Sequence, residues 1–278
     1  MTDVRTAPSA TLNDNVGEPQ GDFVWYELMT PDPEGSKAFY DAVVGWNIGE
    51  AAPEFNGYRM IGRSDGKFAG GVMPLTAEMQ QHGARPTWLG YIHVIDVDES
   101  VRQIAQAGGK ALMQPFDIPN VGRIALVTDP QGAPFYVMKP IPPADDPTGK
   151  SDVFSPDQPQ RVRWNELSTS DPDAAVGFYT RQFGWKQEGD MDMGEMGKYR
   201  FIQSGPVTIG AIMRKPPPLP VSVWTYYIGV DDIDRAVAAI DNGGGRILNG
   251  PMEIPGGEFA LNGMDPQGAA FGFVGPRK

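Results

Sequence analysis

The chain has 278 residues, of which 40% are hydrophobic and 10% aromatic, so it is long and apolar enough for two folded domains and is not a mainly disordered protein. Its net charge of −12 disfavours nucleic acid as a partner, and the absence of cysteine excludes disulfides, thiolate nucleophiles and Cys-ligated metals. With no apolar run long enough to span a membrane, we expect a soluble, cytoplasmic protein that binds a small molecule and neither nucleic acid nor membrane.

The first structured segment after the N-terminal residues has the pattern of a strand followed by a helix. Residues 23–30, FVWYELMT, are rich in aromatic and β-branched side chains, which favours a strand. Asp32 is a good helix N-cap, Pro33 suits the first helical position, and Gly45 suits the residue that ends the helix. Short strands are then expected near residues 57–63 and 68–74.

The next segment repeats this order of elements. Residues 88–97, WLGYIHVIDV, predict a strand, and Asp98 is expected to cap a helix that ends at Gly108. Three strands are expected to complete the unit, near residues 110–113, 123–128 and 133–139. The first half of the chain therefore predicts two βαβββ modules.

The second half of the chain repeats the first. WYEL at residues 25–28 returns as WNEL at 164–167, and DPQGA at 129–133 returns at 265–269. The repeat predicts two domains, residues 21–140 and 161–278, preceded by a flexible tail (1–20) and joined by a Pro-rich linker (141–160). Because each half carries two complete modules, each is expected to fold alone.

These motifs, in this order, resemble a known superfamily. The Asp-capped helix ending in F-Y, the G-W pair, V-x-D-x-D, G-G and D-P-x-G are similar to those of the vicinal oxygen chelate superfamily, which includes glyoxalase I, bleomycin-resistance proteins and extradiol dioxygenases. The duplicated, Trp-rich form is most similar to two-domain glyoxalase-like proteins of actinobacteria. The resemblance implies an α+β fold, in which four βαβββ modules form two tandem glyoxalase-like domains with concave sheets.

The resemblance also implies where a divalent metal would bind, through His or Glu side chains on the first and last strands of paired modules. This sequence has other residues at those positions: Trp25, Trp164, Leu89, Thr225, Tyr136 and Gly272. None of these is a ligand for a hard or borderline metal. We therefore predict no metal ligands and no cofactor, and an atypical site that uses Glu27 and His93 is not favoured.

A tryptophan and a carboxylate stand two residues apart in both halves. Alternate residues of a strand face the same way, so Trp25 and Glu27, and likewise Trp164 and Glu166, should point into the concave sheets. Either carboxylate can be a buried structural tie, held by Tyr, Trp or backbone donors. Alternatively, it is a general base or an acceptor for a ligand, with a pKa raised by desolvation.

Further candidates lie on neighbouring strands. His93 follows Tyr91 by two residues, so Glu27, His93 and Tyr136 are expected to share a cavity, although a lone strand His is also common as a structural residue. The candidate catalytic residues are Glu27, Glu166, His93 and Tyr136. The candidate ligand-binding aromatics, for which core packing is the alternative, are Trp25, Tyr91, Phe135, Trp164, Tyr227 and Phe271.

The Met-rich segment at residues 189–199 is either an ordinary mobile loop or a lid over the second concave sheet. The leading functional hypothesis is a metal-independent, glyoxalase-like protein that processes a small molecule as a lyase, isomerase or hydroxylase. The alternatives are non-catalytic sequestration of an aromatic or drug-like molecule and a duplicated scaffold that acts through its surface. The protein is expected to be a monomer with internal duplication or a weak homodimer.

Overall fold

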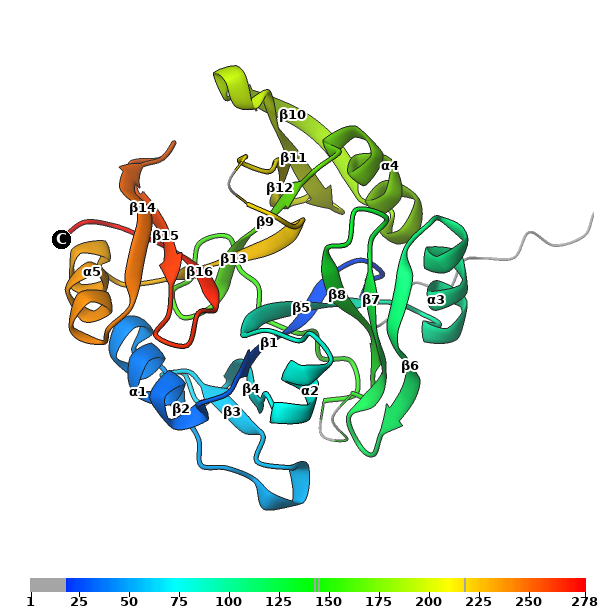
Figure 1. Ribbon diagram of the computed structural model, residues 1–278, viewed down its shortest axis with the longest axis horizontal. Coiled ribbons are helices and arrows are strands. Elements are labelled where there is room, and N and C mark those ends of the chain that lie inside the picture. Colours follow the sequence, from blue (N-terminus) through cyan, green and yellow to red (C-terminus); the bar gives the residue numbers. More distant parts are fainter. Residues whose placement is uncertain (1–18, 143, 145, 218) are drawn as a thin grey trace, which may run out of the picture.

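The computed structural model describes residues 19–142, 144, 146–217 and 219–278, so that most of the predicted tail lies outside the described residues. Two open eight-stranded sheets form the molecule (Figure 1). The first has the strand order β2-β3-β4-β1-β5-β8-β7-β6. Its strands are β1 (Phe23–Thr30), β2 (Asn47–Ile48), β3 (Arg59–Gly62), β4 (Phe68–Pro74), β5 (Thr87–His93), β6 (Lys110–Ile118), β7 (Gly122–Thr128) and β8 (Pro134–Pro140).

The second sheet repeats this topology with the order β10-β11-β12-β9-β13-β16-β15-β14. Its strands are β9 (Val162–Thr169), β10 (Lys186–Asp192), β11 (Lys198–Ser204), β12 (Val207–Arg214), β13 (Val223–Gly229), β14 (Arg246–Glu253), β15 (Phe259–Met264) and β16 (Ala270–Gly275). In each sheet the first strands of the two modules pair antiparallel at the centre, with Glu27 opposite Leu89 and Glu166 opposite Thr225. The predicted α+β fold of four βαβββ modules is confirmed.

The helices are α1 (Pro33–Val44), α2 (Ala77–Gln81), α3 (Val97–Gln106), α4 (Pro172–Phe183) and α5 (Ile233–Asn242). As predicted, the Asp32 side chain caps α1, and Gly45 ends the helix with a φ of 78°, a left-handed conformation that suits glycine. The predicted cap of α3 is wrong by two residues. Asp96, whose backbone is extended, accepts the Glu99 N–H at 2.9 Å, whereas Asp98 lies in the first turn and pairs with Arg123.

The Met-rich segment at residues 189–199 is not an irregular loop. Its first residues belong to β10, a single 3-10 turn follows at Gly194–Met196, and Lys198 begins β11. The two strands pair antiparallel from Lys186 opposite Gln203 to Asp192 opposite Lys198. The segment is thus a hairpin at the edge of the second sheet.

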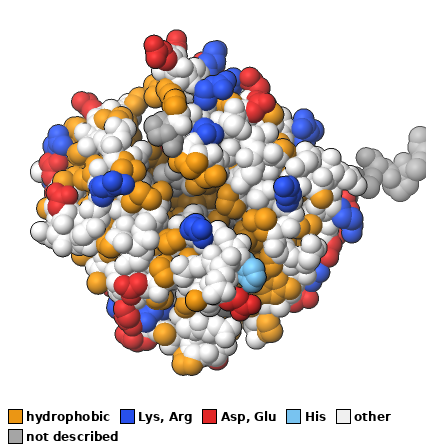
Figure 2. Space-filling model, in the orientation of Figure 1, with side chains coloured by type: hydrophobic (Ala, Val, Ile, Leu, Met, Phe, Trp, Pro, Cys, Tyr) orange, Lys and Arg blue, Asp and Glu red, His pale blue; other side chains and the backbone are white. Residues whose placement is uncertain are grey.

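One hydrophobic core joins the two halves of the chain. Phe23 of the first half contacts the rings of Trp185, Trp224 and Tyr226 of the second. The helices pair across the same boundary, α1 with α5 and α3 with α4 (Figure 1). Figure 2 shows that hydrophobic side chains also gather in the hollowed centre of this face, while charged side chains lie mostly around its periphery.

The polar contacts between the halves are reciprocal. Tyr40 of α1 donates its hydroxyl hydrogen to Asp265 at 3.1 Å, and Tyr179, the corresponding residue of α4, donates to Asp129 at 3.2 Å. Each of these aspartates, which open the two DPQGA motifs, also accepts N–H groups of its own turn, those of Asp129 coming from residues 131 and 133. The halves therefore meet through a two-fold related interface, which argues against the expectation that each folds alone. No helix in the described ranges has the length and hydrophobicity needed to cross a membrane.

Candidate functional site

A large apolar cavity lies over the first sheet. We call it the first cup; it includes Trp25, Glu27, Tyr91 and Tyr136 in its lining and has a volume of about 1630 Å³. Helix α2 and the linker residues 146–151 form part of its wall. Six of its lining residues are methionines: Met29, Met60, Met73, Met79, Met113 and Met138. The sequence directs attention to the methionines of residues 189–199 in the second domain, but the first cup is lined by a larger number of methionines.

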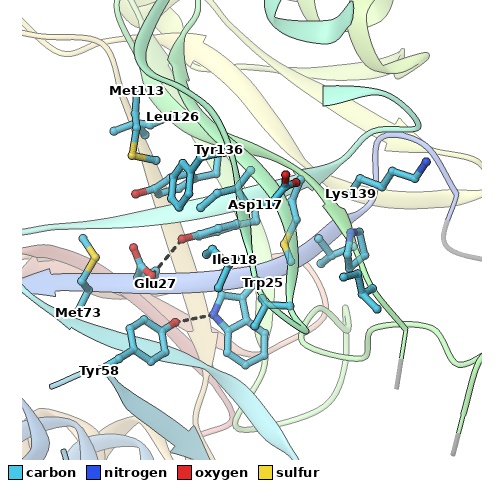
Figure 3. A pocket seen from close by; sticks show the side chains of 18 of the residues that line it. Trp25, Glu27, Tyr58, Met73, Met113, Asp117, Ile118, Leu126, Tyr136 and Lys139 are labelled. Carbon is cyan, nitrogen blue, oxygen red and sulfur yellow. Dashed lines mark hydrogen bonds between the residues drawn. The ribbon is translucent and has the colours of Figure 1, made fainter. Parts of the chain in front are cut away.

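Glu27 points into this cavity from the middle of β1 (Figure 3). Glu27 is only 3% exposed, and its Oε2 accepts a hydrogen bond from the Tyr91 hydroxyl at an O···O distance of 3.0 Å. Its other oxygen, Oε1, has no hydrogen-bond partner among the described residues. Burial raises the pKa of Glu27 to about 7, and the hydroxyls of Tyr91 and Tyr58 offset part of that rise. The group is therefore a carboxyl poised between its acid and its base form at neutral pH.

Tyr58 is a residue of this site that the sequence reasoning missed. Its hydroxyl accepts the indole N–H of Trp25 at 2.9 Å (Figure 3). A Cβ at Gly71, on the neighbouring β4, would lie 1.9 Å from that hydroxyl, so only glycine leaves room for the ring. A signal was present: the pair Tyr58-Arg59 recurs as Tyr199-Arg200.

Tyr136 and His93 both line the first cup, as the strand spacing predicted. The ring of Tyr136 stacks on Tyr91 with centroids 4.1 Å apart, and burial raises the pKa of Tyr136. His93 is 9% exposed, and its Nδ1 lies 3.0 Å from the carbonyl oxygen of Pro19. Burial lowers the pKa of His93, which favours the neutral ring. One ring nitrogen of His93 is thus engaged by the segment that precedes β1.

Phe135 and Phe271 do not line either site, and this prediction is wrong. Phe135 is fully buried against Tyr179 and Phe183 of α4, and Phe271 packs against Phe39 of α1. Successive side chains of a strand point to opposite faces. Because Tyr136 faces the cavity, its neighbour Phe135 must face the core between the two halves.

The second cup, which we define by Trp164, Glu166, Tyr199 and Tyr227, has a closed hydrogen-bond network. The Trp164 indole donates to the Tyr199 hydroxyl at 2.7 Å, and that hydroxyl donates to Glu166 Oε2 at 2.6 Å. Tyr227 donates to Glu166 Oε1 at 3.3 Å. Glu166 is partly exposed, and desolvation still raises its pKa. Both oxygens of this carboxyl therefore have partners.

The residues present do not fit the divalent metal that the fold implies. In the first cup, the expected ligand positions carry the indole of Trp25, whose N–H is a donor already bound to Tyr58, and the phenol of Tyr136. Within the described ranges, no three His, Asp or Glu side chains cluster closely enough to hold a metal ion. Glu27 is surrounded by phenol groups rather than by further ligands. We therefore assign no step to a metal.

Comparison with known sequences identifies relatives over nearly the whole chain. The family model of the Glyoxalase/Bleomycin resistance protein/Dioxygenase superfamily matches residues 22–137 and 161–273. A protein of Mycobacterium tuberculosis named as a candidate glyoxylase, CFP32, is 32% identical over 259 residues, which cover 92% of this chain and 95% of the relative. The anthracycline biosynthesis protein DauV of Streptomyces sp. strain C5 is 30% identical over 269 residues, which cover 90% and 91%.

Solved structures share the fold at low sequence identity. The Mn(II)-bound glyoxalase from Novosphingobium aromaticivorans superimposes with a TM-score of 0.63 at 17% identity, over 94% of this chain and 83% of that one. The 2,2',3-trihydroxybiphenyl 1,2-dioxygenase of Sphingomonas wittichii strain RW1 gives a TM-score of 0.62 at 13% identity, over 92% and 90%. At these identities the likeness concerns the fold alone.

Proposed function

Because the chain belongs to the glyoxalase/bleomycin resistance protein/dioxygenase superfamily, we propose that it binds and processes an apolar, largely aromatic small molecule in its first cup. The observation that carries this proposal is the buried Glu27, which presents an unpaired oxygen to a large apolar cavity. A buried polar atom without a partner is costly, so it favours a ligand that supplies one.

Glu27 is also suited to move a proton. A general base works best when its pKa lies near the working pH, and burial raises the pKa of Glu27 to about 7. Proton abstraction by such a group is the chemistry of isomerases and lyases, which agrees with the leading hypothesis from the sequence. The neighbouring Tyr91 hydroxyl holds the carboxyl in place through Oε2.

The lining of the cavity supports an aromatic ligand. Methionine side chains adapt to flat surfaces of varied outline and make favourable contacts with aromatic rings. Two relatives from Streptomyces, DauV and DnrV, are named as anthracycline biosynthesis proteins, and anthracyclines are polycyclic aromatic compounds. A ligand of that class would cover the apolar walls and leave a polar substituent for Glu27.

Sequestration without conversion is the second candidate, because a wide, methionine-lined cavity also suits a protein that holds a ligand unchanged. The two functions differ in the fate of the ligand. Native mass spectrometry of protein purified from its own cells identifies the bound compound, and incubation with that compound tests conversion. An enzyme of the proposed kind loses conversion on Glu27→Gln, whereas a sequestering protein shows none even in the wild type.

The location of the ligand can be tested with pyrene, a polycyclic fluorophore whose emission reports an apolar environment. Met73 lines the first cup on β4, and Met213 occupies the corresponding position on β12. We expect Met73→Trp to obstruct the part of the cavity beside Glu27 and weaken pyrene binding about tenfold or more, while Met213→Trp leaves it unchanged. Equal loss in both variants, or none in either, would contradict binding in the first cup.

A further inference from the structure

The two cups contain the same Trp-Tyr-Glu chain, but one link of it differs. In the second cup Trp164 donates to Tyr199, and Tyr199 donates to Glu166. In the first cup Trp25 donates to Tyr58, yet Glu27 Oε1 receives no hydrogen bond from any described residue. The first cup is therefore the second cup with its Tyr-to-Glu bond opened.

The opened link leaves a donor, the Tyr58 hydroxyl, and an acceptor, Glu27 Oε1, on the wall of the same cavity. The Tyr58 oxygen already accepts the Trp25 N–H, so its own hydrogen remains available for donation. Tyr58 is close enough to Glu27 to influence its ionisation, and both side chains line the cavity (Figure 3). A ligand group that bonds to both must accept one hydrogen bond and donate another.

The distribution of charged side chains in the cavity disfavours a negatively charged ligand group beside Glu27. The other Asp, Glu and Lys side chains that line the cavity are all exposed and so lie toward the solvent. They are Glu54, Asp117, Asp146, Lys139 and Lys150. No described Lys or Arg side chain is buried in the cavity beside Glu27. A carboxylate or phosphate at this depth would meet the Glu27 charge without a compensating cation.

From this geometry, and resting on the proposed function, we propose that the ligand of the first cup is an uncharged hydroxylated polycyclic aromatic. Its hydroxyl accepts the Tyr58 hydrogen and donates its own to Glu27 Oε1. The rings lie against the methionines of the cavity wall. Tyr58 and Glu27 then act together as the determinant that selects a hydroxylated ligand over the same ring system without the hydroxyl.

A matched pair of probes, 1-hydroxypyrene and pyrene, tests this selection because the two differ only in the hydroxyl. A site that hydrogen-bonds a ligand hydroxyl rejects the analogue that lacks it, since the buried partners are left unpaired. At pH 8, where Glu27 is mostly ionised, we expect the full-length protein to bind 1-hydroxypyrene about tenfold or more tightly than pyrene. Fluorescence titration measures both dissociation constants.

Variants of the two cups show which residues cause the preference for 1-hydroxypyrene over pyrene. Tyr58→Phe and Glu27→Gln should each reduce the preference severalfold while pyrene binding stays near the wild-type value. Tyr199→Phe and Glu166→Gln, the same changes in the second cup, should leave the preference intact. Because pyrene binding itself reports a folded cavity, a variant that misfolds is recognised by the loss of both probes, and Tyr58→Leu then serves as a second replacement that removes the hydroxyl.

Two results would overturn the inference. One is equal binding of the two probes by the wild type, and the other is a preference that survives both Tyr58→Phe and Glu27→Gln. In either case pyrene binding that is still blocked by Met73→Trp leaves the proposed function standing. If neither probe binds the wild type, the proposed function fails together with the inference.

Discussion

The two cups are built on one scaffold, yet they treat the same carboxyl differently. Glu166 is partly exposed and receives a hydrogen bond on each oxygen, from Tyr199 and Tyr227. Glu27 is almost fully buried and receives one only on Oε2, from Tyr91. Glu166 therefore has the properties of a structural tie, whereas Glu27 has the properties of a group that can bind a ligand. The duplicated motif therefore does not imply duplicated function.

The two cups also differ at one pair of corresponding positions, Tyr136 and Gly272. Tyr91 stacks on Tyr136 in the first cup, whereas the corresponding Tyr227 lies over Gly272. A Cβ at Gly272 would lie 2.6 Å from the Tyr227 ring, so the glycine allows that ring to settle against the strand. Tyr227 and Tyr91 each donate to one oxygen of their carboxyl, so the extra bond of Glu166 is the one from Tyr199.

The opposite faces of the sheets show no such divergence. The Tyr40–Asp265 and Tyr179–Asp129 bonds are equivalent, and the indole N–H groups of Trp88 and Trp224 reach Tyr40 and Tyr179 in the same way. Packing between the halves is thus retained in both copies, while the chemistry of the cups differs.

The largest expected effect comes from separating the two halves. If the chain is cut after Lys150, we expect neither fragment to be folded as a monomer, because each exposes aromatic core residues that the other half covers. The two-fold related interface allows folding only with the other fragment or with a second copy. Circular dichroism with sedimentation measures this, and a cooperatively folded monomeric half would show that the two cups are independent domains.

Much of the fold could be predicted because the signals are local. Asp32, Gly45 and their repeats define helix ends through short-range hydrogen bonds, and the repeat itself indicates duplication. The cap of α3 is Asp96 and not the predicted Asp98, because the V-x-D-x-D motif offers two similar carboxylates. Which of them caps depends on backbone angles that the sequence does not specify.

The site could be predicted only in part. Strand alternation brings Trp25, Glu27 and Tyr91 together, and the same rule places Phe135, the neighbour of Tyr136 on β8, on the opposite face. Tyr58 lies just before β3, after a segment whose composition differs between the halves, so spacing along the central strands does not indicate it. The missing bond at Oε1 depends on small displacements of side chains, and no sequence pattern encodes these.

A pH series on Glu27→Gln sharpens the comparison of the carboxyls. Burial raises the pKa of Glu27 from near 4.5 to about 7, so the folded protein holds this proton more tightly than the unfolded chain. Stability is therefore fully present below pH 4.5 and is lost as the pH rises toward 7 and beyond. Relative to wild type, Glu27→Gln should gain up to about 3 kcal/mol between pH 4 and pH 8.

Chemical denaturation of both proteins across this range measures the difference, and the subtraction removes contributions from other titrating groups such as His93. Glu166→Gln is the matched control. Because Glu166 is partly exposed and hydrogen-bonded on both oxygens, its pH-dependent difference should be smaller. A pH-independent difference for Glu27→Gln would show that this carboxyl is not desolvated as described.

The smallest expected effect concerns the two tyrosines that distinguish an open from a closed network. Tyr199→Phe removes two hydrogen bonds, the one accepted from Trp164 and the one donated to Glu166. Tyr58→Phe removes only one, the bond accepted from Trp25, because the bond to Glu27 Oε1 is not formed. Each net hydrogen bond contributes about 1 kcal/mol, so Tyr199→Phe should lower the free energy of unfolding by about 1 kcal/mol more than Tyr58→Phe.

Urea denaturation of ligand-free protein at one pH, with equal slopes for both variants, resolves a difference of this size. Equal losses would mean that Tyr58 does bond Glu27 in the free protein, and the distinction between the two cups would then rest on burial alone.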